Sequence, residues 1–309
     1  MSTLVGRANL AAANTVFETT CNEVLSGQAE GYINRYASKF SADGTSVDLL
    51  MVDGLPQVRQ WTGSKTYYDL RAYKLNVARA VYEASISQKR VDVDGDRTGI
   101  IGKRLAAFAR RAPSMYNKLV VDALVANTAL CYDGQALLAN SHPNTAGNAD
   151  NLEAAALTLA LLKTAIQAIE LRTDELGEPL GLYPDFLLCG PAQRTLALQL
   201  TGSVRPVAVG TSSALDAATV GGAVVLENYV GGELDVGIDP RITGNAWFVM
   251  ATKGEAKPYY LAEFRAPEAI SQTAMDDEAR FTLDEYRWSI EFDLGLVPGA
   301  WQAIHGSVT

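Results

Sequence analysis

The segment VYEASISQKRVDVDGDRTGIIGKRLAAFARRAPSMYNKLVVDAL, residues 81–124, changes its pattern partway along. Its first part, residues 81–91, alternates imperfectly between apolar and polar side chains, which predicts a β-strand. After Asp96 or Thr98, either of which can cap a helix, apolar residues recur at spacings of three and four. This helix would be about 45 Å long if continuous, and Pro113 should kink or split it. Its expected apolar face consists of Ile101, Leu105, Phe108, Ala112, Tyr116, Leu119, Ala123 and Leu124.

The residues before this segment predict a loose arm and then a long hairpin. The first 50 residues suit one or two short amphipathic helices, with Phe17, Val24 and Leu25 on one side, that pack on something else. Residues 52–97 are rich in Tyr, Val, Thr and basic residues, which suits an extended hairpin projecting from a body. An ordinary solvated hairpin is the alternative. Because an isolated two-stranded hairpin is marginal in water, a long one is expected to rest on a partner.

The residues after the long helix alternate between helix and strand. Asp150 and Glu153 have the spacing of a capping box, which predicts that a helix begins there. The stretches PDFLLCG, AVVLENYV, ELDVGID and AWFVMAT read as strands, so residues 150–255 suit a compact α/β subdomain. From residue 256 the chain returns to strict alternation, which predicts further strands.

Composition favours a globular protein. The chain has 309 residues, of which 48% are hydrophobic and 20% charged. It has no apolar run of membrane-spanning length and no signal-peptide pattern at its start, so a cytosolic origin is expected, without a membrane. The formal net charge is −9, so an isolated domain has no overall electrostatic footprint for nucleic acid. Any contact with nucleic acid would have to be local or mediated by other molecules.

No cluster of residues predicts catalysis, a metal site or a cofactor. Ser141 and His142 are adjacent, so in an extended segment they point in opposite directions and form a poor nucleophile–base pair. His305 lies near the C-terminus, where a chain is commonly mobile. The three cysteines, Cys21, Cys131 and Cys189, lie far apart and have no zinc-ligand spacing. The protein is therefore not expected to be an enzyme, and replacing Ser141 or His142 with Ala should leave assembly intact.

The order of elements resembles the tailed-phage major capsid fold of the HK-ninety-seven type, an α+β fold. Successive blocks also resemble the Mu-like major head subunit family, in that family's order from about residue 52 to the C-terminus. These blocks are LPQVRQWTG, YEASISQKRVDVDGDRTG, DGQALLANSHPNTAGNADNL, IDPRITGNAWFVMA and DEYRWSIEFDLGLVPGAWQ. The resemblance implies an N-terminal arm (1–51), an E-loop hairpin (52–97), a peripheral domain with a spine helix (98–150), an axial domain (151–255) and returning strands of the peripheral domain (256–309).

The resemblance further implies a structural protein of the virion. Copies would assemble through hexamers and pentamers, in the host bacterial cytoplasm, into an icosahedral shell that encloses phage DNA. A separate scaffold protein, a portal and decoration proteins are expected partners. The packaged DNA would contact the protein only at the interior of the shell. The alternative is a cytosolic small-molecule-binding or hydrolytic α/β protein, which Ser141, His142 and the acidic turns alone favour.

The basic hairpin in an acidic chain favours the shell, because oppositely charged patches let copies dock on one another. The candidate subunit-interface residues are Trp61, Lys65, Arg71, Lys74 and Arg79. Reversing the charges of Arg71, Lys74 and Arg79 together is expected to weaken association while sparing the fold of the subunit.

Overall fold

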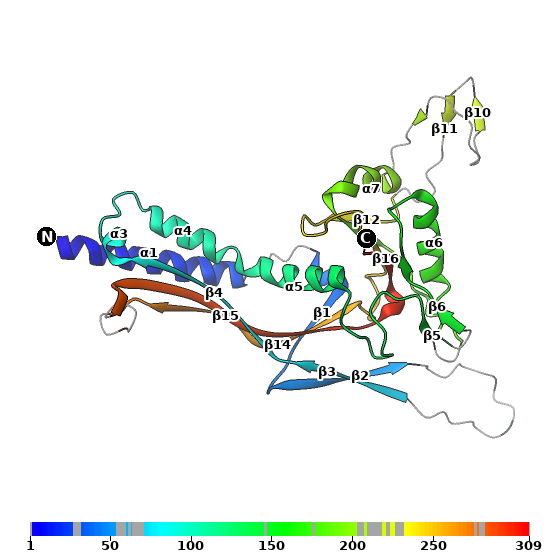
Figure 1. The fold of residues 1–309 in the computed structure, drawn as a ribbon, viewed down its shortest axis with the longest axis horizontal. Helices are drawn as coiled ribbons and strands as arrows, with labels where there is room; N and C mark the ends of the chain where they lie inside the picture. Colours follow the sequence, from blue (N-terminus) through cyan, green and yellow to red (C-terminus); the bar gives the residue numbers. More distant parts are fainter. Residues whose placement is uncertain are drawn as a thin grey trace.

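The computed structural model is an α+β fold built on two main sheets (Figure 1). It describes residues 2–26, 32–53, 60, 63, 71–144, 147–174, 177–202, 207–208, 218–220, 223–225, 232–274, 277 and 282–308. Among these residues, none of the helices is both long enough and apolar enough to cross a lipid bilayer.

The first sheet has four strands and forms the long body of the molecule, with several helices along one face (Figure 1). Its order is β1 (Ala37–Ser41), β14 (Tyr259–Gln272), β15 (Glu285–Pro298) and β4 (Ala80–Lys89). β1 runs parallel to β14, and the other neighbours are antiparallel. The strand expected at residues 81–91 is thus confirmed as β4. Its partner is β15, some two hundred residues later in the chain.

Helix α1 (Ser2–Ser26) packs with α4 (Ile100–Ala109) over this sheet, and the short α3 (Arg90–Asp94) lies beside them. Phe17 of α1, Leu105 of α4 and Trp288 of β15 are buried together between helices and sheet. The first 51 residues thus contain one helix of 25 residues, α1, and the short α2 (Ile33–Tyr36), followed by strands; α1 packs on its own chain. The side chains of Val24 and Leu25 lie outside the described residues.

The expected long helix is split where proline predicts it. α4 ends at Ala109, and α5 (Ala112–Ala126) begins again with Pro113 in its first turn. The N-cap residue of α4 is Gly99 rather than Asp96 or Thr98, but the carboxylate of Asp96 accepts hydrogen bonds from the backbone N–H groups of Ile100 and Ile101, at 3.3 and 3.0 Å. Of the predicted apolar face, Leu105, Tyr116 and Leu124 are buried, whereas Leu119 is half-buried.

The hairpin consists of β2 (Ser46–Asp53) and β3 (Arg71–Ala78), which pair from Ser46↔Ala78 to Asp53↔Arg71. The prediction that residues 52–97 form the hairpin was wrong at both ends, because its first strand begins at Ser46 and its second ends at Ala78. The chain then passes through Arg79 into β4. Local alternation predicts a strand, but it does not identify the strand with which it pairs.

The second sheet has five strands in the order β12 (Asp235–Ile238), β8 (Phe186–Cys189), β13 (Trp247–Met250), β16 (Ile304–Ser307) and β7 (Leu152–Glu153). All residues of β8, β13 and β16 are buried, with α6 (Leu159–Glu170) and α7 (Arg194–Thr201) packed against the sheet. Shorter elements are α2 (Ile33–Tyr36), β5 (His142–Asn144), β6 (Gly147–Ala149), β9 (Val207–Ala208), β10 (Ala218–Val220), β11 (Ala223–Val225) and two 3₁₀ turns, Pro191–Gln193 and Trp301–Ala303.

Two predictions in this part of the chain are corrected. The helix predicted at Asp150 begins instead at Leu159, with Thr158 as its N-cap, while Asp150 accepts a hydrogen bond from the backbone of Leu152 at 3.0 Å. The final strand, β16, lies in the five-stranded sheet rather than beside β14 and β15. Apart from the bounds of the hairpin, the division into five domains remains a prediction.

Candidate assembly surfaces

The inner face of the hairpin is attached to the body of the molecule. Leu75 and Val77 of β3 are buried against Ala262 of β14. The rings of Tyr73 and Tyr132 lie 5.2 Å apart. A Cβ atom at Gly295 of β15 would lie 2.5 Å from the Val77 side chain, so the absence of a side chain there lets the hairpin approach. The hairpin therefore rests on its own subunit along one face.

The outer face of the hairpin carries a small polar network and one exposed leucine. The Lys74 ammonium lies 2.8 Å from the Asp48 carboxylate, and the Asn76 amide donates to the same carboxylate at 2.7 Å. Hydrogen bonds from Lys74 and then Asn76 lower the pKa of Asp48. Leu50, directly opposite Lys74 in the register, is 68% exposed. This face presents both charge and apolar surface to solvent.

Arg79 differs from Lys74 because its guanidinium is used within the subunit. It lies between β3 and β4, and its Nε donates to Asp293 Oδ2 at 2.8 Å while Nη2 pairs with the same oxygen. The Asp293 side chain is 1% exposed, and Arg265 approaches its other oxygen at 3.1 Å. Burial opposes ionisation of Asp293, but the bonds from Arg79 and Arg265 outweigh it, so the pKa is lowered. Arg79 is therefore engaged within the subunit, and its predicted role at an interface stays a prediction.

The structure does not describe the side chains of the other three predicted interface residues. Trp61 and Lys65 lie outside the described residues, and the same holds for the side chain of Arg71, whose backbone belongs to β3. Their role at an interface stays a prediction.

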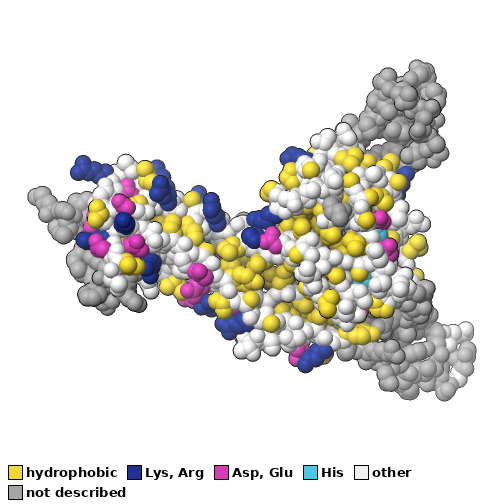
Figure 2. Space-filling model, viewed as in Figure 1, with side chains coloured by type: hydrophobic (Ala, Val, Ile, Leu, Met, Phe, Trp, Pro, Cys, Tyr) yellow, Lys and Arg dark blue, Asp and Glu magenta, His cyan; other side chains and the backbone are white. Residues whose placement is uncertain are grey.

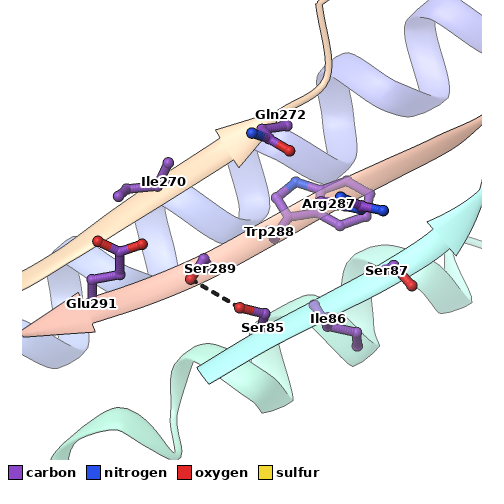
Figure 3. A pocket seen from close by; sticks show the side chains of 9 residues that line it. All are labelled: Ser85, Ile86, Ser87, Ile270, Gln272, Arg287, Trp288, Ser289 and Glu291. Atoms are coloured by element: carbon purple, nitrogen blue, oxygen red, sulfur yellow. Dashed lines mark hydrogen bonds between the residues drawn. The ribbon is translucent and has the colours of Figure 1, made fainter. Parts of the chain in front are cut away.

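The long sheet also has a groove of about 460 Å³ on the face opposite its helices (Figure 3). A hydrogen bond of 3.1 Å joins the hydroxyls of Ser85 and Ser289 across β4 and β15 within it. The indole of Trp288 is fully buried, and its N–H donates to Asn14 of α1 at 2.9 Å. The other lining residues are Ile86, Ser87, Ile270, Gln272, Arg287 and Glu291. This lining mixes hydroxyl, amide, charged and apolar groups.

The structure places the side chains of Ser141 and His142 in different environments. His142 is fully buried, its Nδ1 lies 2.6 Å from Asp133 Oδ2, and its ring stacks on Trp301 with centroids 4.2 Å apart. Ser141 is exposed. The hydroxyl and the imidazole therefore lie on opposite sides of the backbone, as their adjacency predicts. The burial of His142 changes the expectation for His142→Ala, which should destabilise the subunit.

The expectation of a mobile C-terminus around His305 was wrong. His305 is 3% exposed in β16, and its Nε2 lies 3.2 Å from Glu153 Oε1 of β7. Burial lowers its pKa, and the bond to Glu153 opposes this shift. Both histidines thus have carboxylate partners that the sequence spacing did not indicate. The signal that was missed is that no charged residue follows Asp293, which is typical of a buried segment.

The described residues contain no group of three or more potential metal ligands. The three cysteines are free and buried. Burial, followed by the charge of Glu18, raises the pKa of Cys21 to about 11, and burial raises that of Cys189 to about 11. Such thiols are protonated at neutral pH and are poor nucleophiles.

Comparisons with known proteins bear on the family and the fold of the chain. The family described as phage capsid protein matches residues 78–305, which include the strands of both main sheets except β1 and the end of β16. The major capsid protein of Escherichia phage Mu is 27% identical over 89 residues, 28% of this chain and 29% of that protein. The Mu-like prophage FluMu major head subunit of Haemophilus influenzae is 24% identical over 90 residues, 29% of each chain. The chain thus aligns with less than a third of the length of these two relatives.

Structural similarity extends over more of the chain. A chain of the procapsid of bacteriophage JBD30 has a TM-score of 0.53 and 19% identity, covering 97% of this chain and 75% of that one. At this identity the likeness shows the fold, the tailed-phage capsid fold that the order of elements resembles. Because the family match covers well over half of the sequence, this chain belongs to the phage capsid protein family.

Proposed function

We propose that this protein is the major capsid protein of a tailed phage, whose copies assemble into the shell around phage DNA. The observation that carries the proposal is the amount of surface left open by an otherwise well-packed chain. The subunit exposes 17540 Å², whereas a compact monomer of this mass exposes about 12,600 Å². The excess corresponds to several interfaces of standard size. Membership of the phage capsid protein family supports the same conclusion.

Within this proposal, the outer face of the hairpin contacts a neighbouring copy. Leu50 and Lys74 supply an apolar and a charged contact from one rigid ribbon, and Trp61, Lys65 and Arg71 extend the same interface. Arg79 serves this interface indirectly, because its bond to Asp293 helps to hold the hairpin at its base.

The finer features follow from the same proposal. The copies form hexamers and pentamers of an icosahedral shell, and assembly takes place in the host bacterial cytoplasm. A separate scaffold protein, a portal and decoration proteins are the expected partners. The role is structural rather than enzymatic, since the exposed Ser141 and the buried His142 are poorly placed to act together.

The test combines electron microscopy with size-exclusion chromatography of the purified chain. Pentamers, hexamers or closed particles support the shell, and a monomer that persists at high concentration contradicts it. Leu50→Asp should reduce particle yield without changing thermal unfolding. Leu171→Asp, at a residue that is 69% exposed after α6, is the matched control. Equal yields from both variants would argue against the hairpin as the interface.

A further inference from the structure

In one long stretch of this acidic chain, every charged residue is basic. From Arg97 to Val121 the sequence contains no Asp or Glu, although the whole chain has 35 acidic and 26 basic residues. Within this stretch Lys118 pairs with Asp122, and no ion pair among the described residues involves the other cations. We call these the basic ridge: Arg97, Lys103, Arg104, Arg110 and Arg111.

Lys103 and Arg104 lie on the exposed side of α4, Arg110 and Arg111 follow its last residue, and Arg97 precedes its first. Residues 103 and 110 are seven apart, which is about two helical turns or 10.5 Å, and residues 104 and 111 repeat this spacing. All five side chains are exposed, whereas Ile101, Leu105 and Ala109 are buried on the opposite side. The small side chain of Ala107 lies between the pair Lys103 and Arg104 and the pair Arg110 and Arg111. Figure 2 shows Lys and Arg side chains along the upper edge of the elongated part of the molecule that contains α4.

The stability of the helix does not account for this arrangement. Cations are favourable at the C-terminal end of a helix, which explains Arg110 and Arg111. Lys103 and Arg104 lie near the N-terminal end of α4, where the helix dipole disfavours positive charge. These charges are therefore expected to serve a binding partner rather than the fold.

The chemistry of the ridge favours a phosphate backbone over a protein partner. The centre of a protein interface is depleted in Lys and contains aromatic or large aliphatic anchors. The middle of the ridge carries Ala107 instead, and Ile100 is the nearest exposed large apolar residue in the helix. Lys and Arg side chains are sufficient to bind a phosphate backbone, and the affinity they supply does not depend on the base sequence.

We propose that the basic ridge of α4 binds the backbone of duplex DNA without reading its sequence. This inference rests on the proposed function, which places phage DNA inside the shell. It also reconciles a net charge of −9 with a nucleic-acid cargo, since the contact is local and confined to α4 and the residues that flank it.

The test measures DNA binding by unassembled full-length subunits between 50 and 200 mM salt, using fluorescence anisotropy with two duplexes of unrelated sequence. Five phosphate contacts predict a loss of affinity of about 500-fold over this range, because each contact contributes about 0.9 to the slope of log K against log salt. Lys103→Gln/Arg104→Gln should reduce this loss to about 40-fold. Both duplexes should respond equally.

The matched control is Arg194→Gln/Lys253→Gln, which removes two exposed cations outside the ridge and should leave the slope unchanged. If Lys103→Gln/Arg104→Gln fails to fold, Arg110→Gln/Arg111→Gln makes the same test. Equal slopes for ridge and control variants, or no DNA binding at 50 mM salt, would overturn the proposal. So would displacement of the DNA by poly-glutamate as effectively as by unlabelled duplex, which would point to an acidic protein segment. Particle formation is measured separately by light scattering, so that failure to assemble counts against the proposed function alone.

Discussion

Replacing Arg79 should destabilise the isolated subunit, because the residue is a partner of the buried Asp293. Removing the partner of a buried charge costs about 3–5 kcal/mol when none remains. Here Arg265 remains, 3.1 Å from the second carboxylate oxygen, and the Arg79 side chain is itself 36% exposed. The relevant scale is therefore that of one hydrogen bond to a charged group, about 1.5–3 kcal/mol. Arg79→Met should lower the free energy of unfolding by about 2 kcal/mol.

The control is Lys74→Met, which removes an ion pair whose partners are 66% and 41% exposed. Exposed pairs contribute about 0.2–1 kcal/mol, so this variant should unfold nearly as the wild type does. Urea unfolding of unassembled subunits, followed by tryptophan fluorescence, measures both variants. The double variant Arg79→Met/Asp293→Asn should cost less than the sum of its single changes, because the two residues are coupled. If Arg79→Met lost no more stability than Lys74→Met, the ion pair would not hold the fold as we describe.

The same reasoning changes the charge-reversal experiment that the sequence suggests. Arg79→Glu would place a second carboxylate against the buried Asp293, so reversing Arg71, Lys74 and Arg79 together would damage the subunit itself. A loss of assembly in that triple variant would then say nothing about interfaces. Reversing the charges of Arg71 and Lys74 alone leaves the Arg79–Asp293 ion pair intact, so a loss of assembly would then report on the hairpin surface.

Leu105→Asp should abolish soluble expression, because truncating a buried leucine alone costs about 2–5 kcal/mol and the charge adds to it. Leu119→Asp, at a half-buried position, should fold with a reduced melting temperature. His142→Ala should lower the free energy of unfolding by about 3 kcal/mol through the loss of its stacking and hydrogen bond, whereas Ser141→Ala should be neutral in the same urea titration. The pKa of His305 is lower in the folded chain than in the unfolded chain, so the unfolded chain binds this proton at a higher pH. The free energy of unfolding should therefore decrease as the pH is lowered below 6.5. His305→Gln should flatten that dependence between pH 6.5 and 5, and an unchanged slope would contradict the assignment.

Local patterns predicted the elements but not their partners. The alternation of residues 81–91 and the break at Pro113 depend on neighbours in sequence, and the structure confirms both. The pairing of β4 with β15 depends on contacts about two hundred residues apart, which no local pattern encodes. The capping-box pattern at Asp150 failed for a related reason. Its segment is drawn into β7 beside β16, so tertiary pairing outweighs the local signal.

The candidate surfaces show the same limit at the level of single residues. Sequence identified a basic hairpin, but it could not distinguish Lys74, whose partner is exposed, from Arg79, whose partner is buried. It likewise could not show that His142 stacks on Trp301, because the two are far apart in the chain. The charge of a side chain is known from sequence, whereas its availability for a partner depends on which groups the fold places beside it.

The position of Arg79 explains why one side chain has so much influence on the hairpin. It is the single residue between β3 and β4, where the chain leaves the hairpin and enters the long sheet. Its backbone N–H donates to Thr45 at 3.0 Å and its Nη1 to the Gly44 carbonyl at 3.3 Å, so it also holds the turn that leads into β2. Because its remaining nitrogens bind Asp293 of β15, both ends of the hairpin are fixed to the sheet through one guanidinium. These contacts within one subunit therefore set the direction in which the outer face of the hairpin points. That direction in turn decides which neighbouring subunit the outer face can contact.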